Sequence, residues 1–175
     1  MNFVKDFWDV LWKILGWFKI ITFIEEWNEG LVIQAGKFRR TLKPGWWFHL
    51  PLGIDEIYII NVKPAALELE EQSLTTRDNM KIVCRGVLMW SVFDVKKIYI
   101  EVEDAEDTLG DIAVGVIQEQ VEQQDWEYIR TPEFRTDMKK AIQKQARKWG
   151  ITVSSVKFQD LTLADSYRIF GGVST

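Results

Sequence analysis

The chain has 175 residues, which suits one domain with a real hydrophobic core, and its net charge of −4 argues against a general role in nucleic-acid binding. A single cysteine, Cys84, excludes an intrachain disulfide and a cysteine-based metal site. Its place in a strand-like run predicts a small buried residue rather than a reactive thiol. Six of the nine tryptophans fall within the first 47 residues. Because tryptophan suits positions between apolar and wet surroundings, this suggests a membrane interface.

Residues 3–18 have the pattern of an amphipathic helix. On a helical wheel the polar residues share one arc, the large apolar residues fill the opposite side, and three tryptophans lie near the borders. We therefore interpret residues 1–24 as a membrane-associating segment. The residues predicted to contact the membrane are Phe3, Phe7, Trp8, Leu11, Trp12, Ile14, Leu15, Trp17, Phe18 and Ile21.

Three placements of this segment remain open: it lies in or re-enters the membrane surface, it crosses the bilayer, or it packs as a soluble helix. A straight span would put Lys13 near the bilayer centre, at a cost of roughly 2.5–3.5 kcal/mol. A helix in the interface avoids this cost, because its polar arc faces water. We favour the interfacial or re-entrant placement.

From Trp27 onward the pattern favours strands. We expect two strands joined by a turn at Ala35-Gly36-Lys37, followed by a turn at Pro44-Gly45. Further strands are predicted over 56–62, 66–74 and 80–93, with Gly86 as a candidate bulge in the last.

Three aromatic residues, Trp46, Trp47 and Phe48, follow the Pro-Gly turn. Neighbouring residues of a strand point to opposite sides, so three adjacent aromatic residues cannot all face one core. We interpret them as the tip of a turn that makes a second membrane contact. The alternative is that they close the end of the β core.

The second half of the chain is predicted to be mainly helical. One helix follows Asp104 as N-cap, and another begins at Pro132 after the cap Thr131 and ends at Gly150. A closing strand over 151–163 comes next. Residues 164–175 are expected to form a short tail with a helix over 164–170.

Charge is unevenly placed on these helices. Residues 101–127 carry ten acidic side chains and no Lys or Arg, whereas residues 130–148 carry seven basic ones. Either both are solvated faces, or the basic helix meets the acidic segment within one chain or across a subunit boundary. Such pairs would set orientation more than strength. The residues assigned to this interface are Glu103, Asp107, Asp111, Glu119, Glu122, Arg135, Lys139, Lys140, Lys144 and Arg147.

The search for catalytic chemistry is negative. The lone histidine, His49, has no partner that would build a metal site or a catalytic triad. The sequence has no phosphate-binding glycine loop and no nucleophile elbow. We therefore expect neither an enzyme nor a bound metal or cofactor.

Three motifs, taken in order, resemble the SPFH (Band 7) family of stomatins, prohibitins and flotillins. The family's opening is similar to "EEWNEGLVIQAGKFRRTLKPGWWFHLPLGIDEIYIINV", with its Gly-Lys turn, Pro-Gly pair and aromatic pair. Its T-K/R-D turn and long strand resemble "SLTTRDNMKIVCRGVLMWSVFD", and its closing strand resembles "WGITVSSVKFQDLTL". The resemblance implies an α+β domain over 25–163, with an antiparallel β part, then helices, then a closing strand.

The resemblance also implies a function. Members of the family attach to membranes, assemble into rings or cages and act as scaffolds without a cofactor. We therefore expect membrane lipids and further copies of this chain as partners, and no nucleic acid. The alternative is a regulatory subunit that binds and restrains a membrane protease or channel. Relatives continue into a long coiled coil, whereas twelve residues follow Leu163 here, which suggests a short member at the cell membrane of a bacterium or phage host.

Overall fold

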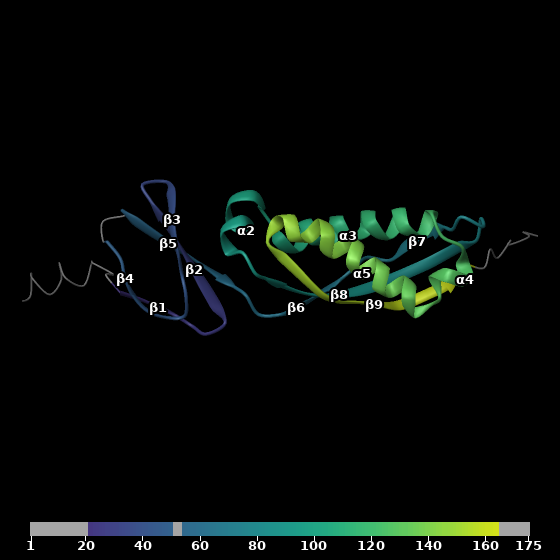
Figure 1. Cartoon of the computed structure of the whole chain (residues 1–175), viewed down its shortest axis with the longest axis horizontal. Helices are drawn as coiled ribbons and strands as arrows, with labels where there is room; N and C mark the ends of the chain where they lie inside the picture. The colour runs from purple at the N-terminus through teal and green to yellow at the C-terminus, as the bar shows by residue number, and fades with distance from the viewer. Residues whose placement is uncertain (1–20, 51–53, 165–175) are drawn as a thin grey trace, which may run out of the picture. The chain divides into compact units, whose positions relative to one another are not determined.

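The computed structural model describes residues 21–50 and 54–164 (Figure 1), and the chain divides into two compact units. Unit 1 comprises Met1–Lys63 and unit 2 comprises Pro64–Thr175. The helix predicted over 3–18, with all its membrane-contact residues, lies outside the described residues. So do residues 165–170 of the predicted last helix.

The described part of unit 1 consists of five antiparallel strands in two groups. β1 (Ile21–Ile24) pairs with β4 (Gly45–Phe48) in a two-stranded ribbon. β2 (Asn28–Gln34) forms the centre of a three-stranded sheet, between β3 (Lys37–Leu42) and β5 (Asp55–Asn61). Residues 21–24 are therefore a strand that belongs to the folded unit, although we placed them in the membrane-associating segment.

The turn between β2 and β3 lies where the sequence predicts it. Ala35 and Gly36 adopt positive φ angles of 48° and 75°, as a two-residue type I′ hairpin requires. The register of this hairpin shifts between Val32 and Ile33, which marks a β-bulge in the pairing with β3.

The core of unit 1 joins the ribbon to the sheet. Ile24 from β1 packs with Val32 and Leu42, all three almost fully buried, and the half-buried Trp47 and Ile57 pack against them. One face of the ribbon therefore packs against this core.

The sheet of unit 2 is built on two long strands. β8 (Lys81–Val92) pairs along its length with the closing strand β9 (Ile151–Leu163). Its other edge pairs with β6 (Ala65–Glu68) and β7 (Gln72–Thr75), so the single strand predicted over 66–74 is in fact two.

A bulge lies beside Gly86, as predicted, but its extra residue is Gln159 of β9, so the prediction named the wrong strand. The pairing of β8 with β9 shifts between Arg85 and Gly86, and the Gly86 carbonyl accepts a hydrogen bond from the Leu69 amide at 2.8 Å.

The helical part of unit 2 covers one face of this sheet, as Figure 1 shows for α3 and α5. The long helices are α3 (Ala105–Glu122) and α5 (Pro132–Ala146). Shorter ones that the sequence did not predict are α2 (Val95–Glu101) and α4 (Trp126–Ile129), whereas the 3₁₀ turn η1 (Arg147–Trp149) completes the helix predicted to end at Gly150. Within the described ranges, no helix is long and apolar enough to cross a membrane.

The predicted helix signals are confirmed. The Asp104 carboxylate accepts from the Glu106 and Asp107 amides at 2.9 and 3.1 Å, and Thr131 caps α5 through the Phe134 amide at 3.3 Å. The apolar stripes of both helices point to the sheet. Their buried residues are Leu109, Ala113, Val116, Ile117, Val121, Phe134, Met138, Ile142 and Ala146.

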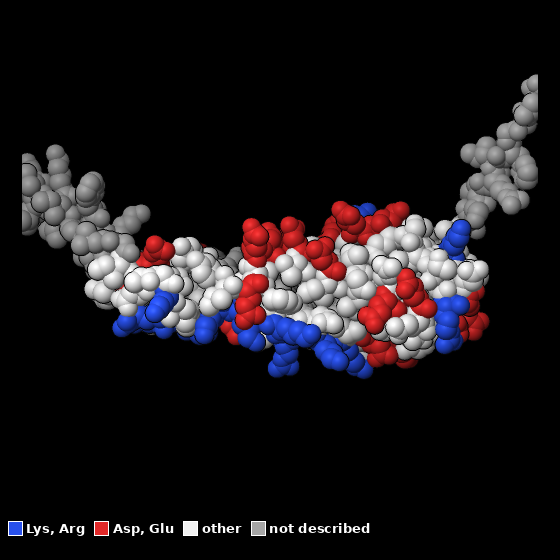
Figure 2. Space-filling model, turned by 90° about the horizontal axis from the view of Figure 1, so that it is seen from above, with Lys and Arg blue, Asp and Glu red and all other residues white. Residues whose placement is uncertain are grey.

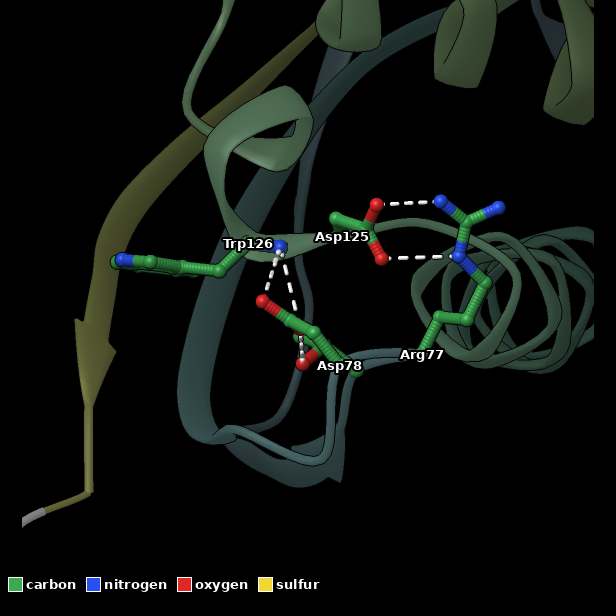
Figure 3. Close-up of polar contacts among 5 residues, drawn as sticks. Arg77, Asp78, Asp125 and Trp126 are labelled. Carbon is green, nitrogen blue, oxygen red and sulfur yellow. Dashed lines mark hydrogen bonds and ion pairs between the residues drawn. The ribbon is translucent and has the colours of Figure 1, made fainter.

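The turn between β7 and β8 is tied to the start of α4 (Figure 3). The Arg77 guanidinium forms a two-pronged ion pair with the Asp125 carboxylate, whose Nε–Oδ1 distance is 2.8 Å. The Asp78 carboxylate accepts from the Trp126 amide at 3.3 Å. Both carboxylates accept hydrogen bonds through their side-chain oxygens. The Thr-Arg-Asp turn therefore connects the β7–β8 hairpin to the start of α4.

The observed order is the predicted one: antiparallel strands, then helices, then a closing strand, in an α+β architecture. The first candidate surface lies on unit 1 and the second on unit 2.

Candidate functional site

The outer face of the β1–β4 ribbon is apolar and exposed. Ile21 lies opposite Phe48 and Phe23 opposite Trp46, and directly paired residues of antiparallel strands point to the same side. Their exposed fractions are 51%, 69%, 51% and 72%, in that order. The Phe23 and Trp46 ring centroids are 5.0 Å apart. We call these four residues the ribbon face.

The intervening aromatic residue points the other way. Trp47 is half-buried against the core of unit 1, and its indole Nε1 donates to the Lys43 carbonyl at 2.6 Å. The Arg40 guanidinium lies 5.5 Å from its ring centroid. The prediction that residues 46–48 form the tip of a turn is wrong, because they form a strand that pairs with β1.

Side chains alternate between the two faces of β4, so both interpretations of its aromatic residues, membrane contact and closure of the β core, have residues that suit them. Trp47 closes the core, whereas Trp46 and Phe48 remain exposed beside Ile21 and Phe23. Several adjacent apolar side chains on one surface mark an interaction site more often than single exposed ones do. Sequence reasoning missed Phe23. The available signal was that neighbours in a strand face opposite sides, so Phe23 is exposed where Ile24 is buried.

The second candidate surface is the charged helical layer of unit 2. Nine of the ten residues predicted for an assembly interface are exposed, and Lys139 is half-buried. Within the described ranges, no ion pair joins the acidic members of this group to the basic ones. Lys140 instead pairs with Asp137 of its own helix at 3.1 Å.

The two charges occupy opposite edges of this layer. Figure 2 looks onto the helices and shows acidic side chains gathered along one edge of unit 2, whereas the opposite edge carries a basic stretch followed by further acidic side chains. α3 and α5 pack side by side, and they carry most of the predicted acidic and basic residues respectively. Each copy therefore presents one acidic edge and, opposite it, an edge with a basic stretch.

A groove runs along the basic edge. It has a volume of about 590 Å³, and its lining includes Lys139, Arg147 and the half-exposed Phe93. Gln143 closes one wall, because its side-chain amide bonds the β9 backbone at Ile151 and Val153. Phe93 directly follows β8 and is not part of an apolar repeat in the sequence, so sequence reasoning did not single it out.

Two further candidates for chemistry were the single cysteine and a metal site. Cys84 is buried in unit 2, as predicted, and its burial raises the pKa of the thiol to about 11. Over residues 21–50 and 54–164, no group of three or more His, Cys, Asp or Glu side chains could hold a metal ion.

Comparison with known proteins places these features in a family. The family model described as "SPFH domain / Band 7 family" matches residues 22–169. An uncharacterized protein of Schizosaccharomyces pombe is 31% identical over 84% of the chain, and a stomatin-like protein of Caenorhabditis elegans is 29% identical over 82%. The rat protein "Stomatin-like protein 2, mitochondrial" is 26% identical over 81%.

These alignments cover only part of the relatives. They span 42%, 45% and 41% of the yeast, nematode and rat proteins respectively. The family match itself covers most of the present chain, from the first described strand to beyond β9. The chain therefore belongs to the SPFH (Band 7) family.

Proposed function

We propose that this protein is a membrane-attached, non-enzymatic scaffold whose copies assemble side by side into a ring or cage that organises a patch of membrane. The observation that carries the proposal is the ribbon face, a row of four large apolar side chains on the outside of unit 1. Family membership and stomatin-like relatives support it.

The ribbon face has the chemistry of an interfacial membrane contact. Trp46 and Phe48 are the two most exposed of its residues. Full burial of one such side chain is worth roughly 1.5–3 kcal/mol, and aromatic rings suit the zone between head groups and hydrocarbon. A surface of this kind would dip into one leaflet without crossing it.

The predicted N-terminal helix would be a second contact. Its apolar side and tryptophan borders, over residues 3–18, suit the same interfacial zone as the ribbon face. β1 begins at Ile21, so little chain separates the two contacts. Two weak interfacial contacts on one chain reinforce each other through their effective concentration.

The charged edges of unit 2 support the proposed self-assembly. Opposite charge on opposite edges favours a contact in which the basic edge of one copy meets the acidic edge of the next. Such a head-to-tail contact repeats and closes into a ring when its rotation permits. The groove beside Phe93, Lys139 and Arg147 gives the basic edge an apolar element as well.

The membrane contact is tested by replacing Trp46 and Phe48 with serine in the full chain. Binding to phospholipid vesicles, measured by flotation, should fall by about tenfold or more, because two interfacial side chains are lost. The matched control is Ile100→Ser, which removes an exposed large apolar residue of unit 2 outside the groove and should leave vesicle binding unchanged. Equal binding by the double variant and the wild type would contradict the proposal.

A further inference from the structure

Unit 1 contains a hollow of about 350 Å³ at the border of the ribbon face. Its lining includes Arg39 and Arg40 from β3, His49 and Leu50 from the segment after β4, and Asp55 from β5. Phe48 lines it too, and the same side chain forms one end of the ribbon face. A hollow with charged groups in its lining and an apolar surface therefore meet at one residue.

The β-bulge brings two consecutive arginines to this hollow. In a regular strand neighbours point to opposite faces. Here Val32 pairs with Arg40 and Ile33 with Phe38, so Arg39 is the extra residue of the bulge. Arg39 donates to the Gln34 amide oxygen, and Arg40 lies near the Trp47 ring. Across the described part of the chain, neither guanidinium forms an ion pair with a carboxylate.

Two further polar groups in the hollow have unmet hydrogen-bonding capacity. His49 Nδ1 and Asp55 Oδ1 are shielded from solvent and have no hydrogen-bond partner among the described residues. The other Asp55 oxygen, Oδ2, accepts from the Leu50 amide at 2.9 Å, which fixes the carboxylate in place. Shielded polar atoms without partners are unfavourable, and a ligand that supplies a donor relieves the penalty.

These groups suit a ligand that carries a negative group and a positive group at separate positions. Two guanidinium groups suit a phosphate, because arginine binds phosphate oxygens through several N–H donors. The free oxygen of a fixed carboxylate suits a primary ammonium group. The adjoining ribbon face suits the apolar part of the same molecule, since Phe48 belongs to both surfaces.

We propose that this hollow binds the head group of an ethanolamine phospholipid. The phosphate lies against Arg39 and Arg40, and the ammonium group donates to Asp55 Oδ1. The proposal rests on the proposed membrane attachment and adds a lipid preference to it. A volume of about 350 Å³ falls within the range of small-ligand sites.

The first test compares vesicles of phosphatidylcholine with vesicles that also contain phosphatidylethanolamine, using the full chain. Both lipids are zwitterionic, but the choline ammonium has no N–H donor. The wild type should bind the ethanolamine vesicles about tenfold more tightly, the effect of one charge-assisted hydrogen bond. Asp55→Asn should abolish this preference, and replacing Arg39 and Arg40 with glutamine should weaken binding to both vesicles.

The matched control is Lys37→Gln, which removes a cation from the same hairpin without touching the lining of the hollow. It should retain the preference. Ethanolamine lipids also change bilayer packing, to which interfacial contacts respond. A preference that persists in Asp55→Asn would therefore arise from packing and would overturn the proposal.

The second test needs no variant. His49 is the only histidine, so histidine-selective labelling gives one imidazole to follow by NMR. Glycerophosphoethanolamine should shift its signals at concentrations at which glycerophosphocholine and inorganic phosphate, which offer no N–H donor to Asp55, do not. Equal shifts from all three would show a site for phosphate alone and overturn the ethanolamine assignment. Failure of the wild type to bind any vesicle would overturn the proposed membrane attachment instead, while the NMR result still decides the head-group site.

Discussion

The Cys84 thiol lies on the side of β8 that faces the helices, between the fully buried Ile82 and Leu88. Burial disfavours the thiolate and raises the pKa of Cys84 to about 11. Because the thiolate is the reactive form, we expect the folded protein at pH 8 to react with Ellman's reagent far more slowly than the protein unfolded in guanidinium. Complete reaction on mixing with the folded protein would contradict this placement.

The Arg77–Asp125 ion pair predicts a specific dependence of stability on pH. The hydrogen bond from Arg77 lowers the pKa of the Asp125 carboxyl below its usual value. A lowered folded-state pKa means that the pair stabilises the fold above the ordinary carboxyl pKa of about 4. That contribution is lost as the pH falls through the lower folded-state pKa.

We therefore expect Asp125→Asn to lower the melting temperature by a few degrees at pH 7. The gap to the wild type should narrow as the pH falls below about 4, as followed by circular dichroism. Glu127→Gln is the matched control, because Glu127 is an exposed acid on the same short helix. A gap that stays constant down to pH 2 would show that the carboxylate charge is not what stabilises the junction.

The junction between α5 and β9 depends on one glycine. Gly150 ends the 3₁₀ turn η1 with φ of 81°, and its carbonyl accepts from the Phe93 and Asp94 amides at 2.9 and 3.2 Å. A Cβ atom there would lie 2.6 Å from the Asp94 carbonyl oxygen, so neither the backbone angle nor the space allows a side chain. This position links the last helix to the closing strand.

Gly150→Ala should lower the free energy of unfolding by roughly 2–4 kcal/mol, measured by urea denaturation. The matched control is Gly115→Ala in α3, where an added Cβ meets no atom within 4 Å. That change should stabilise the protein by about 0.5–1 kcal/mol, because alanine is the better helix former. Similar stability changes at the two glycines would contradict the proposed strain at Gly150.

At the scale of the whole molecule, assembly should depend on charge. Replacing Lys139, Lys140 and Lys144 with glutamate removes the positive edge of α5, so we expect smaller oligomers by mass photometry of the detergent-extracted protein. A charge-matched control reverses Lys37, Lys81 and Lys157, which lie on strands rather than on α5, and should leave oligomer size unchanged.

Mixing offers a sharper criterion for the same contact. A second variant reverses Asp107, Asp111 and Glu119 on α3 to lysine. If the edges meet head to tail, each variant alone should form smaller oligomers, because the two edges that meet then carry the same charge. An equimolar mixture of the two should assemble again. Oligomers of normal size from either variant alone would rule out an electrostatic contact between copies.

Much of the fold can be predicted from local sequence signals. The caps Asp104 and Thr131, the turn at Ala35-Gly36 and the helix end at Gly150 all lie where predicted, because each depends on residues close in sequence. The ordered motifs likewise identify the family that the comparison shows. The predicted helix over 3–18 and its membrane contacts remain predictions.

Only the tertiary structure reveals the two surfaces of unit 1 that carry the proposals. The ribbon face depends on the pairing of β1 with β4, two strands separated by twenty residues of intervening chain. The hollow beside Phe48 depends on a bulge that places both Arg39 and Arg40 in its lining. The sequence by itself determines helix ends, turns, charge segments and family through local patterns. Which side chains share a face is decided by non-local strand pairing and register, because a shift of one residue reverses every side chain of a strand.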